Sequence, residues 1–322
     1  MTRRPRPASR LALYLACRAA LALLAALPRR AGQALGRLLG RIVYLTSTRH
    51  RLVALHNLHR ALGREMPEPQ RRRIAREAFA HVGMICVDAA YFRRLLRLPT
   101  ESLAVYEGVE HLRAAAAEGR GVLVFSGHFG HWELVALLQH RLGVPMAMVV
   151  RPLDDPRFDA LLMRLRSLSG NSILPKRNAA RGVLRSLRDG GAVALLIDQN
   201  VRGDGGVFVD FFGEPASTTP SLATFALKSG APIVPVFSYP LPDGRLKIVY
   251  RPALRAARHG PLQGDILEVT RDCTALLEEE VRRHPECWFW MHNRWRTRPP
   301  VRLGRPDAVL SPVGGAVDRS AP

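Results

Sequence analysis

Short apolar runs recur along the middle of the chain and alternate with segments of helical periodicity. Four runs are apolar almost throughout, at residues 121–125, 144–150, 192–197 and 233–238. Runs of this length predict strands that are buried on both faces. Helices are predicted between and before them, at residues 107–118, 158–168 and 179–188. This alternation predicts an α/β fold, with a layered and mostly parallel sheet flanked by helices.

The segments on either side of this region are mostly helical in pattern. Residues 46–98 predict helices, with a loop at Pro67 and Pro69 before a helix over 70–97. Residues 266–283 predict a long helix. Residues 246–250 follow the turn at 242–244 and predict an edge strand.

The amino-terminal residues carry a different pattern. Residues 11–27 are almost entirely apolar, with Arg18 near the middle. A membrane span needs about 20 apolar residues, and a central arginine costs about 2.5 to 3.5 kcal/mol on insertion. We therefore expect an uncleaved membrane-anchoring helix, which either spans the bilayer or lies in its interface.

A second amino-terminal helix is predicted to be amphipathic. Its apolar residues recur at helical spacing, with Arg37 and Arg41 off the stripe: Leu35, Leu38, Leu39, Ile42 and Val43. Such a helix suits an anionic membrane surface; the alternative is that the stripe packs on the protein's own core. The expected organisation is a membrane-binding segment at 1–45, one folded domain at 46–301, and a disordered tail at 302–322.

Composition narrows the class of partner. The 322 residues carry a formal net charge of +21, which favours polyanions such as anionic lipid headgroups, an acidic carrier protein or nucleic acid. No nucleic-acid-binding motif accompanies this charge, so we expect no nucleic acid partner. The four cysteines are scattered without a C-x2-C pair. This argues against a disulfide framework or a structural zinc and fits a reducing compartment.

The candidate chemistry lies where the first apolar run ends. His128 and Glu133 follow residues 121–125 and precede an apolar helical segment at 134–138. If His128 lies before the first regular helical turn, the two side chains can converge, and Glu133 would then hold one ring nitrogen of a general base. The alternative is a buried histidine with an unrelated surface glutamate. A zinc site that also uses His131 is disfavoured, because its spacing differs from H-E-x-x-H.

Residues 128–133, His-Phe-Gly-His-Trp-Glu, resemble the H-x4-D/E box of the lysophospholipid acyltransferase superfamily. The extended form is similar to the late acyltransferases of lipid A biosynthesis, the lauroyl/myristoyl transferase family. Further blocks resemble that family in the expected order, at Asn57-Leu58, Asp198-Gln199-Asn200, 209–213 with 218–220, and 285–295. The resemblance extends from about residue 10 to residue 300.

The resemblance implies a glycerolipid acyltransferase-like fold and a catalytic pair. His128 would be the base and Glu133 its orienting acid. From their position at the start of the predicted helix, and not from the resemblance, we expect backbone amides near 129–131 to help stabilise the oxyanion. Asp198 matches a functional aspartate of the family. Residues 211–215 predict a turn with two aromatic side chains, which in the family lies near the acceptor or acyl-chain site; the alternative is a satellite hydrophobic cluster.

The resemblance also implies a functional arginine downstream of the box. It falls on Arg166 or Arg164, of which we favour Arg166. This side chain would pair with Asp198 or bind a phosphate or oxyanion. Arg151, after a predicted strand, is a weaker candidate for binding an anionic headgroup.

The implied activity is acyl transfer from an acyl-carrier-protein thioester to a hydroxyl of a lipid A precursor. It would need no cofactor and no metal, and would take place on the cytoplasmic face of a bacterial inner membrane. Within the same superfamily, another glycolipid such as a phosphatidylinositol mannoside, or a lysophospholipid, is an alternative acceptor. From a different class, a basic membrane- or nucleic-acid-binding protein without catalysis would explain the charge but not the motifs.

Overall fold

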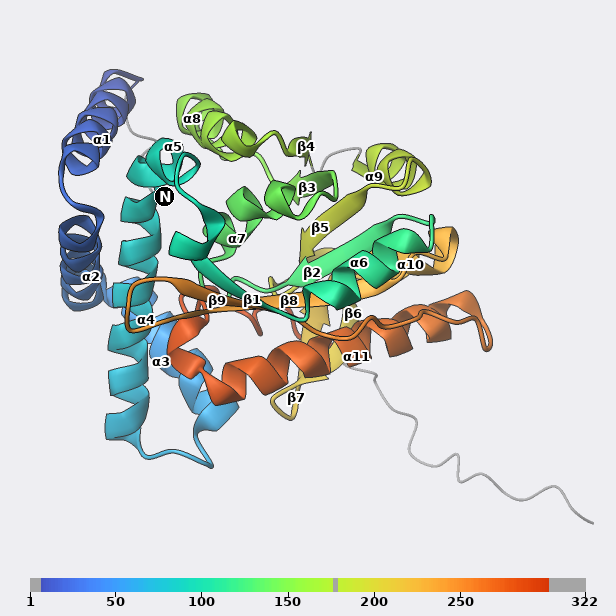
Figure 1. The fold of residues 1–322 in the computed structure, drawn as a ribbon. Coiled ribbons are helices and arrows are strands. Elements are labelled where there is room, and N and C mark those ends of the chain that lie inside the picture. The colour runs from blue at the N-terminus through green and yellow to red at the C-terminus, as the bar shows by residue number, and fades with distance from the viewer. Residues whose placement is uncertain (1–6, 176–178, 301–322) are drawn as a thin grey trace, which may run out of the picture.

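A seven-stranded sheet forms the centre of the computed structural model, which describes residues 7–175 and 179–300. Its strand order is β1-β9-β8-β2-β5-β3-β4, and all neighbouring strands are parallel except β8 and β9. The strands are β1 (Ala104–Glu107), β2 (Val122–Ser126), β3 (Met146–Val150), β4 (Ser172–Pro175), β5 (Ala192–Leu196), β8 (Ile233–Pro240) and β9 (Leu246–Tyr250). The predicted α/β fold with a mostly parallel sheet is confirmed (Figure 1).

Helices cover both faces of this sheet because β2 is apolar on both sides. Leu123 and Phe125 belong to one buried cluster, with side chains from α9 (Ala179–Arg188), α10 (Ser221–Ser229) and α11 (Leu262–Arg283). Val122 and Val124 belong to a second cluster on the opposite face, with α6 (Val109–Ala117) and α7 (Trp132–Leu138). The partly buried Leu165 of α8 (Pro156–Arg166) packs against that second cluster.

Two predicted elements differ from those found. The helix predicted over residues 107–118 is present as α6, but the strand before it, β1, is not predicted and is only four residues long. Because β1 pairs with β9, β9 lies inside the sheet, and the edge-strand prediction for 246–250 is wrong. The predicted helix over 70–97 is interrupted: α4 (Glu68–Asp88) ends at Asp88, and a 3-10 turn leads into the short α5 (Phe92–Leu95).

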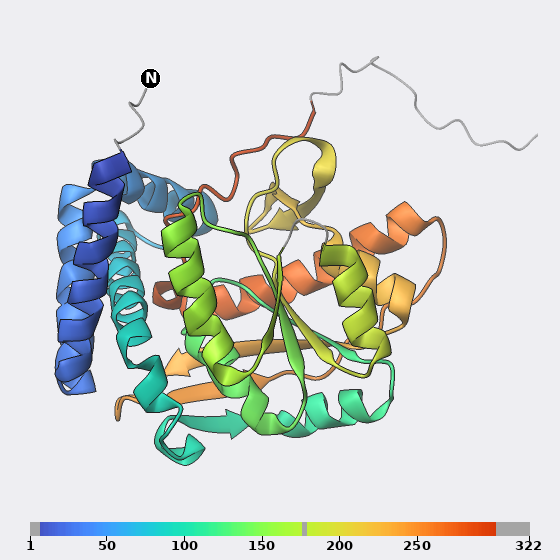
Figure 2. The ribbon, with the colours of Figure 1, turned by 90° about the horizontal axis from the view of Figure 1, so that it is seen from above.

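The amino-terminal helices α1 (Pro7–Ala26) and α2 (Arg29–Thr46) lie along one flank of the molecule beside α4 (Figures 1 and 2). α2 turns two glycines, Gly36 and Gly40, toward α4, and a third, Gly32, faces Tyr91 in the turn after α4. A Cβ at Gly40 would come 2.1 Å from the carbonyl oxygen of Phe79, so only glycine allows this approach. The helix α3 (Thr48–Leu62) follows and also packs on α4.

The predicted amphipathic stripe of α2 faces outward. Its members are between 37% and 53% exposed, and they are Leu35, Leu38, Leu39, Ile42 and Val43. The alternative in which this stripe packs on the protein's own core is therefore wrong. Within residues 7–175 and 179–300, no helix combines the length and the apolarity that a membrane crossing requires.

A separate two-stranded hairpin, β6 (Val207–Phe211) with β7 (Glu214–Thr218), stands beside the main sheet. The predicted turn at its tip is present, with Phe212 at a φ of 59°. Its aromatic rings pack into the core: Phe211 is fully buried and stacks on Trp295 at 5.7 Å between ring centroids. The predicted disordered tail at 302–322 lies outside the described residues.

Candidate active site

The sheet register brings His128 and Asp198 together. Parallel strands β2 and β5 are paired so that Ser126 lies opposite Leu196, the last residue of each strand. His128 and Asp198 each follow their strand end by two residues. Because both strands end at the same edge of the sheet, the two side chains meet there, at the carboxyl edge where α/β proteins form their sites.

Asp198 holds His128 through both its ring and its backbone. Nδ1 of His128 lies 2.8 Å from Oδ1 of Asp198, and the backbone N–H of His128 donates to Oδ2 at 2.8 Å. Trp288 also donates to Oδ2 from its indole nitrogen at 2.8 Å. A carboxylate accepts only, so Nδ1 carries the proton, and Nε2 is the acceptor nitrogen of the neutral ring. This is the arrangement that a general base requires.

The charges of this pair shift both pKa values. Burial alone would lower the pKa of His128, but the charge of Asp198 and its hydrogen bond outweigh burial, so the net pKa is raised. Burial alone would raise the pKa of Asp198, but His128 and the donors around the carboxylate lower it to about 2. Asp198 is thus ionised at neutral pH and stabilises a proton taken up by His128.

Aromatic rings flank the free side of His128. The ring centroid of Trp132 lies 5.2 Å away and that of Phe289 lies 6.0 Å away. The amide nitrogen of Gln199 lies 3.3 Å from Nε2. The side chain of His128 keeps 21% exposure, so a hydroxyl can reach Nε2 from solvent or from a bound lipid.

Glu133 does not hold a nitrogen of His128, which corrects the predicted dyad. Its carboxylate instead forms a two-point ion pair with Arg166 of α8, with 2.9 Å between Nε and Oε2. Glu133 lies on the first turn of α7, where the helix has already rotated its side chain away from His128. Arg166 therefore pairs with Glu133. The pairing of Arg166 with Asp198, which is one of the roles expected from the sequence, is not found. The side chains of the rival zinc arrangement bind separate partners: His128 binds Asp198, His131 binds Asp88, and Glu133 binds Arg166.

The structure separates the three candidate arginines. Arg166 lines the same cavity as Glu133. Arg164 is exposed on α8 and borders a different cavity, lined also by Arg18 of α1. Arg151 follows β3 at the carboxyl edge and is exposed. Of the three, Arg166 is the one that forms an ion pair with the H-x4-E box.

The predicted oxyanion donors are largely engaged in other bonds. The amide of Gly130 donates to the carbonyl of Cys287 at 2.9 Å. The amide of His131 donates to Oγ of Ser238 at 2.9 Å. These two amides fix the loop instead of facing a substrate, so the expectation of an amide cradle at 129–131 is not supported for either of them.

An apolar cavity of about 90 Å³ runs from this loop into the sheet. Its walls come from β2, β3, β5 and α7, and they include Val124, Met146, Met148, Val135 and Ala194. Trp132, Glu133 and Arg166 border it. A cavity lined by methionine and aliphatic side chains, with one ion pair at its border, suits a flexible hydrocarbon chain with a polar end.

Sequence patterns assign no chemical step to residues 285–295, and the structure gives this segment a role. The segment supports the site: Trp288 binds Asp198, and Phe289 flanks His128. The side chain of Asn57 donates to the carbonyls of Trp290 and His292, at 2.8 and 2.6 Å. Asn57 thereby ties α3 to the segment that carries Trp288. The sequence does carry one signal for this supporting role: Asn57 and residues 285–295 both belong to the blocks that resemble the family.

Comparison with known proteins assigns the class of enzyme. The sequence is 32% identical to the lipid A biosynthesis lauroyltransferase of Escherichia coli (strain K12) over 241 residues. This match covers 73% of this chain and 76% of the relative. It is 28% identical over 254 residues to the lipid A biosynthesis palmitoleoyltransferase of that strain, covering 78% of this chain and 80% of the relative. The protein is an acyltransferase.

The family follows from a longer match. Residues 6–297 match the family described as bacterial lipid A biosynthesis acyltransferase, and the chain belongs to that family. It is also 28% identical over 218 residues to the phosphatidylinositol mannoside acyltransferase of Mycobacterium tuberculosis (strain CDC 1551 / Oshkosh), covering 64% of this chain and 66% of the relative.

Proposed function

We propose that the protein transfers a fatty acyl chain from an acyl-carrier-protein thioester to a hydroxyl of a lipid A precursor. The observation that carries the proposal is the His128–Asp198 pair, in a member of the lipid A acyltransferase family. The ring of Trp132 lies against His128 and lines the apolar cavity. The acceptor would be the hydroxyl of a 3-hydroxyacyl chain on the glucosamine disaccharide.

The reaction begins at Nε2 of His128. This nitrogen takes the proton of the acceptor hydroxyl, while Asp198 holds the ring through Nδ1 and stabilises the charge that forms. The hydroxyl oxygen attacks the thioester carbonyl, the tetrahedral intermediate collapses, and His128 returns the proton to the leaving sulfur. Direct attack requires no serine or cysteine nucleophile.

The ion pair of Arg166 and Glu133 supplies a fixed cation at the border of the cavity. Glu133 engages Nε and one terminal nitrogen of Arg166, so the guanidinium is held in one orientation and keeps further N–H donors. Those donors would stabilise the developing oxyanion or bind an anionic group of a substrate. Glu133 is thus a positioning residue for Arg166.

The outward apolar stripe of α2 supports attachment to the cytoplasmic face of a bacterial inner membrane. Arg37 and Arg41 flank the stripe and form ion pairs with Glu77 of α4. A surface of this kind inserts its apolar side among acyl chains and keeps its cations at the headgroups. The net charge of +21 suits both an acidic carrier protein and a phosphorylated acceptor.

Similarity to a mycobacterial relative favours a second class of acceptor, a mannose-bearing glycolipid. The mycobacterial relative is named as a phosphatidylinositol mannoside acyltransferase. A mannose hydroxyl on a glycolipid would use the same base and the same acyl cavity, so this acceptor differs only in the headgroup that it presents.

Acyl transfer by detergent-solubilised protein tests the proposal. Acyl-carrier-protein donors of several lengths are combined with a lipid A precursor, a phosphatidylinositol mannoside or a lysophospholipid, with His128→Ala beside the wild type. Transfer to the lipid A precursor that is lost in the variant supports the proposal. If the protein transfers acyl chains only to another acceptor, that acceptor takes the place of the lipid A precursor in the proposed reaction. If no acyl chain is transferred from any donor to any acceptor, the proposal is overturned.

A further inference from the structure

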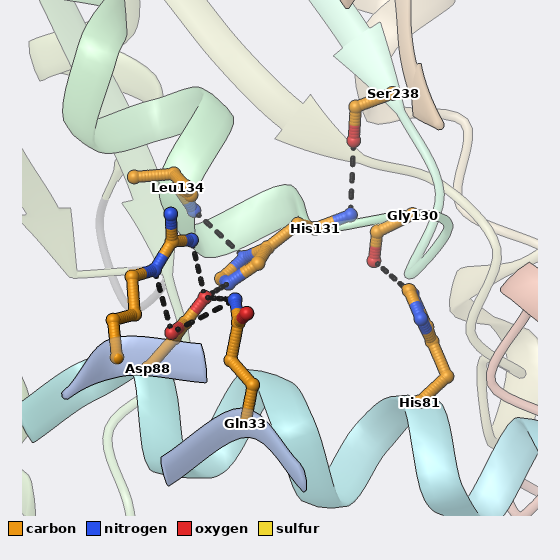
Figure 3. Close-up of polar contacts among 8 residues, drawn as sticks. Gln33, His81, Asp88, Gly130, His131, Leu134 and Ser238 are labelled. Atoms are coloured by element: carbon orange, nitrogen blue, oxygen red, sulfur yellow. Dashed lines mark hydrogen bonds and ion pairs between the residues drawn. The ribbon is translucent and has the colours of Figure 1, made fainter. Parts of the chain in front are cut away.

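Asp88, the last residue of α4, carries a buried charge that the active site described above does not use. Its side chain is fully buried. From α2, Arg29 donates to both carboxylate oxygens, at 3.0 and 2.7 Å, and Gln33 donates to Oδ2 at 3.0 Å. From the loop that carries His128, Nε2 of His131 lies 3.0 Å from Oδ2 (Figure 3). One carboxylate therefore joins α2, α4 and the catalytic loop.

His131 has a defined protonation pattern in this network. The backbone N–H of Leu134 donates to Nδ1 at 3.1 Å, so Nδ1 is an acceptor and Nε2 carries the proton that is donated to Asp88. The backbone N–H of His131 donates to Ser238 of β8 at 2.9 Å. Since His131 is only 1% exposed, it fixes the start of α7 from within the protein.

The same loop has a second attachment to α4. Nε2 of His81 lies 3.1 Å from the carbonyl oxygen of Gly130 (Figure 3). Gly130 has a φ of 58°, and a Cβ there would come 1.9 Å from the carbonyl oxygen of Ser238. The loop thus follows one path between β2 and α7, held from α4 at Gly130 and at His131.

We propose that Asp88 and His131 form a positioning pair through which α2 and α4 fix the loop that carries His128. Neither residue touches the reacting atoms. Arg29 and Gln33 of α2 complete the shell around Asp88, so the contact of α2 with α4 is coupled to the placement of the base. The catalytic part of this inference rests on the proposed acyl transfer, whereas the mechanical coupling does not.

Two substitutions of His131 separate this link from helix capping. In His131→Asn, the side-chain oxygen can still accept from Leu134, as Nδ1 does, but the side chain is too short to reach Asp88. In His131→Gln, the longer amide can donate to Asp88. Arg29→Met removes the ion pair from the α2 side and leaves the loop sequence intact.

Hydrogen exchange of the full-length protein in detergent measures the coupling without any substrate. We expect amides of residues 126–134 to exchange about tenfold faster in His131→Asn and in Arg29→Met, because the loop opens locally. His131→Gln should stay near the wild type, and amides of α11 should be unchanged in all variants. Wild-type exchange of the loop in His131→Asn, or faster exchange throughout the chain, would overturn the proposal.

Kinetics then test the positioning role. Misplacing a base by about 1 Å can reduce turnover about a hundredfold, so kcat should fall in His131→Asn with KM nearly unchanged, and His131→Gln should restore it. A loop that loosens without loss of kcat would contradict the positioning role. If the wild type transfers no acyl chain at all, the proposed function fails, and the exchange data alone decide whether Asp88 couples α2 to the loop.

Discussion

Asp198 binds His128 at two points, its ring Nδ1 and its backbone N–H, each at 2.8 Å. A carboxylate that accepts from both places fixes the position of the histidine as well as its tautomer. The rotation of the imidazole is thereby restricted, and Nε2 is directed away from Asp198. The catalysis that we propose for His128 depends on this relationship.

Trp288→Phe should weaken the site through Asp198. The indole N–H donates to Oδ2, and a hydrogen bond to a buried charge contributes about 1.5 to 3 kcal/mol. We expect a loss of about 2 kcal/mol in the free energy of unfolding, together with slower acyl transfer. Denaturant unfolding and initial rates measure both effects.

Trp295→Phe is the matched control for that substitution. The indole nitrogen of Trp295 is buried and has no hydrogen-bond partner among the residues that the structure describes. Its removal should therefore cost less stability than the loss at Trp288. Equal losses in the two variants would contradict the role given to the Trp288 hydrogen bond.

Arg166→Ala should reduce transfer about a hundredfold or more, because a fixed cation beside the reacting group is lost. Arg164→Ala removes an equal charge two residues earlier on α8, at a side chain that borders another cavity. It should leave the rate within about twofold, as expected for a charge outside the site. Steady-state rates of the two variants give the comparison, and similar losses in both would show that charge alone matters.

Substitutions in the apolar cavity should change the preferred donor length. Met148→Ala enlarges the cavity and should favour longer acyl chains, whereas Ala194→Leu fills it and should favour shorter ones. One methylene in an apolar pocket changes discrimination by about tenfold or more. Relative kcat/KM values over a series of acyl-carrier-protein donors measure the preference. Unchanged preference in both variants would place the acyl chain elsewhere.

Charge placed on the α2 stripe should weaken membrane binding. Leu38→Glu puts a carboxylate at a side chain that is 53% exposed, and it should reduce sedimentation with anionic vesicles without lowering the melting temperature. Leu262→Glu is a control at another exposed leucine, on α11, with 38% exposure. If both variants bind vesicles as the wild type does, α2 is not the membrane-facing surface.

The sequence predicts much of this fold because its strands are short, apolar and separated by helices. It also places His128 and Asp198 at the ends of two strands. Their contact depends on β2 and β5 being neighbours in one register, and apolar runs do not specify which strands pair. The H-x4-E spacing instead favours Glu133, whose side chain the first turn of α7 directs to Arg166.

The packing of α2 on α4 is a second feature that the hydrophobic pattern of the sequence does not predict. The apolar stripe of α2 is evident in the sequence, but the role of the opposite face is not. Glycines at 32, 36 and 40 recur every four residues; Gly36 and Gly40 pack against Gly83 of α4, and Gly32 packs against Tyr91. That spacing is the available signal for close helix packing. β1 is not predicted for another reason. Its four residues are too few to show the alternation of apolar and polar residues that identifies a strand.

The most direct test of the central claim is the pH dependence of kcat/KM for acyl transfer by the wild type, Asp198→Asn and Glu133→Gln. His128 acts in its unprotonated form, which predominates above its pKa, and Asp198 raises that pKa. Removing the carboxylate should therefore move the acid limb to lower pH and reduce the rate by about four orders of magnitude. Glu133→Gln should move the limb less. A limb that moves further in Glu133→Gln than in Asp198→Asn would contradict Asp198 as the partner of the base.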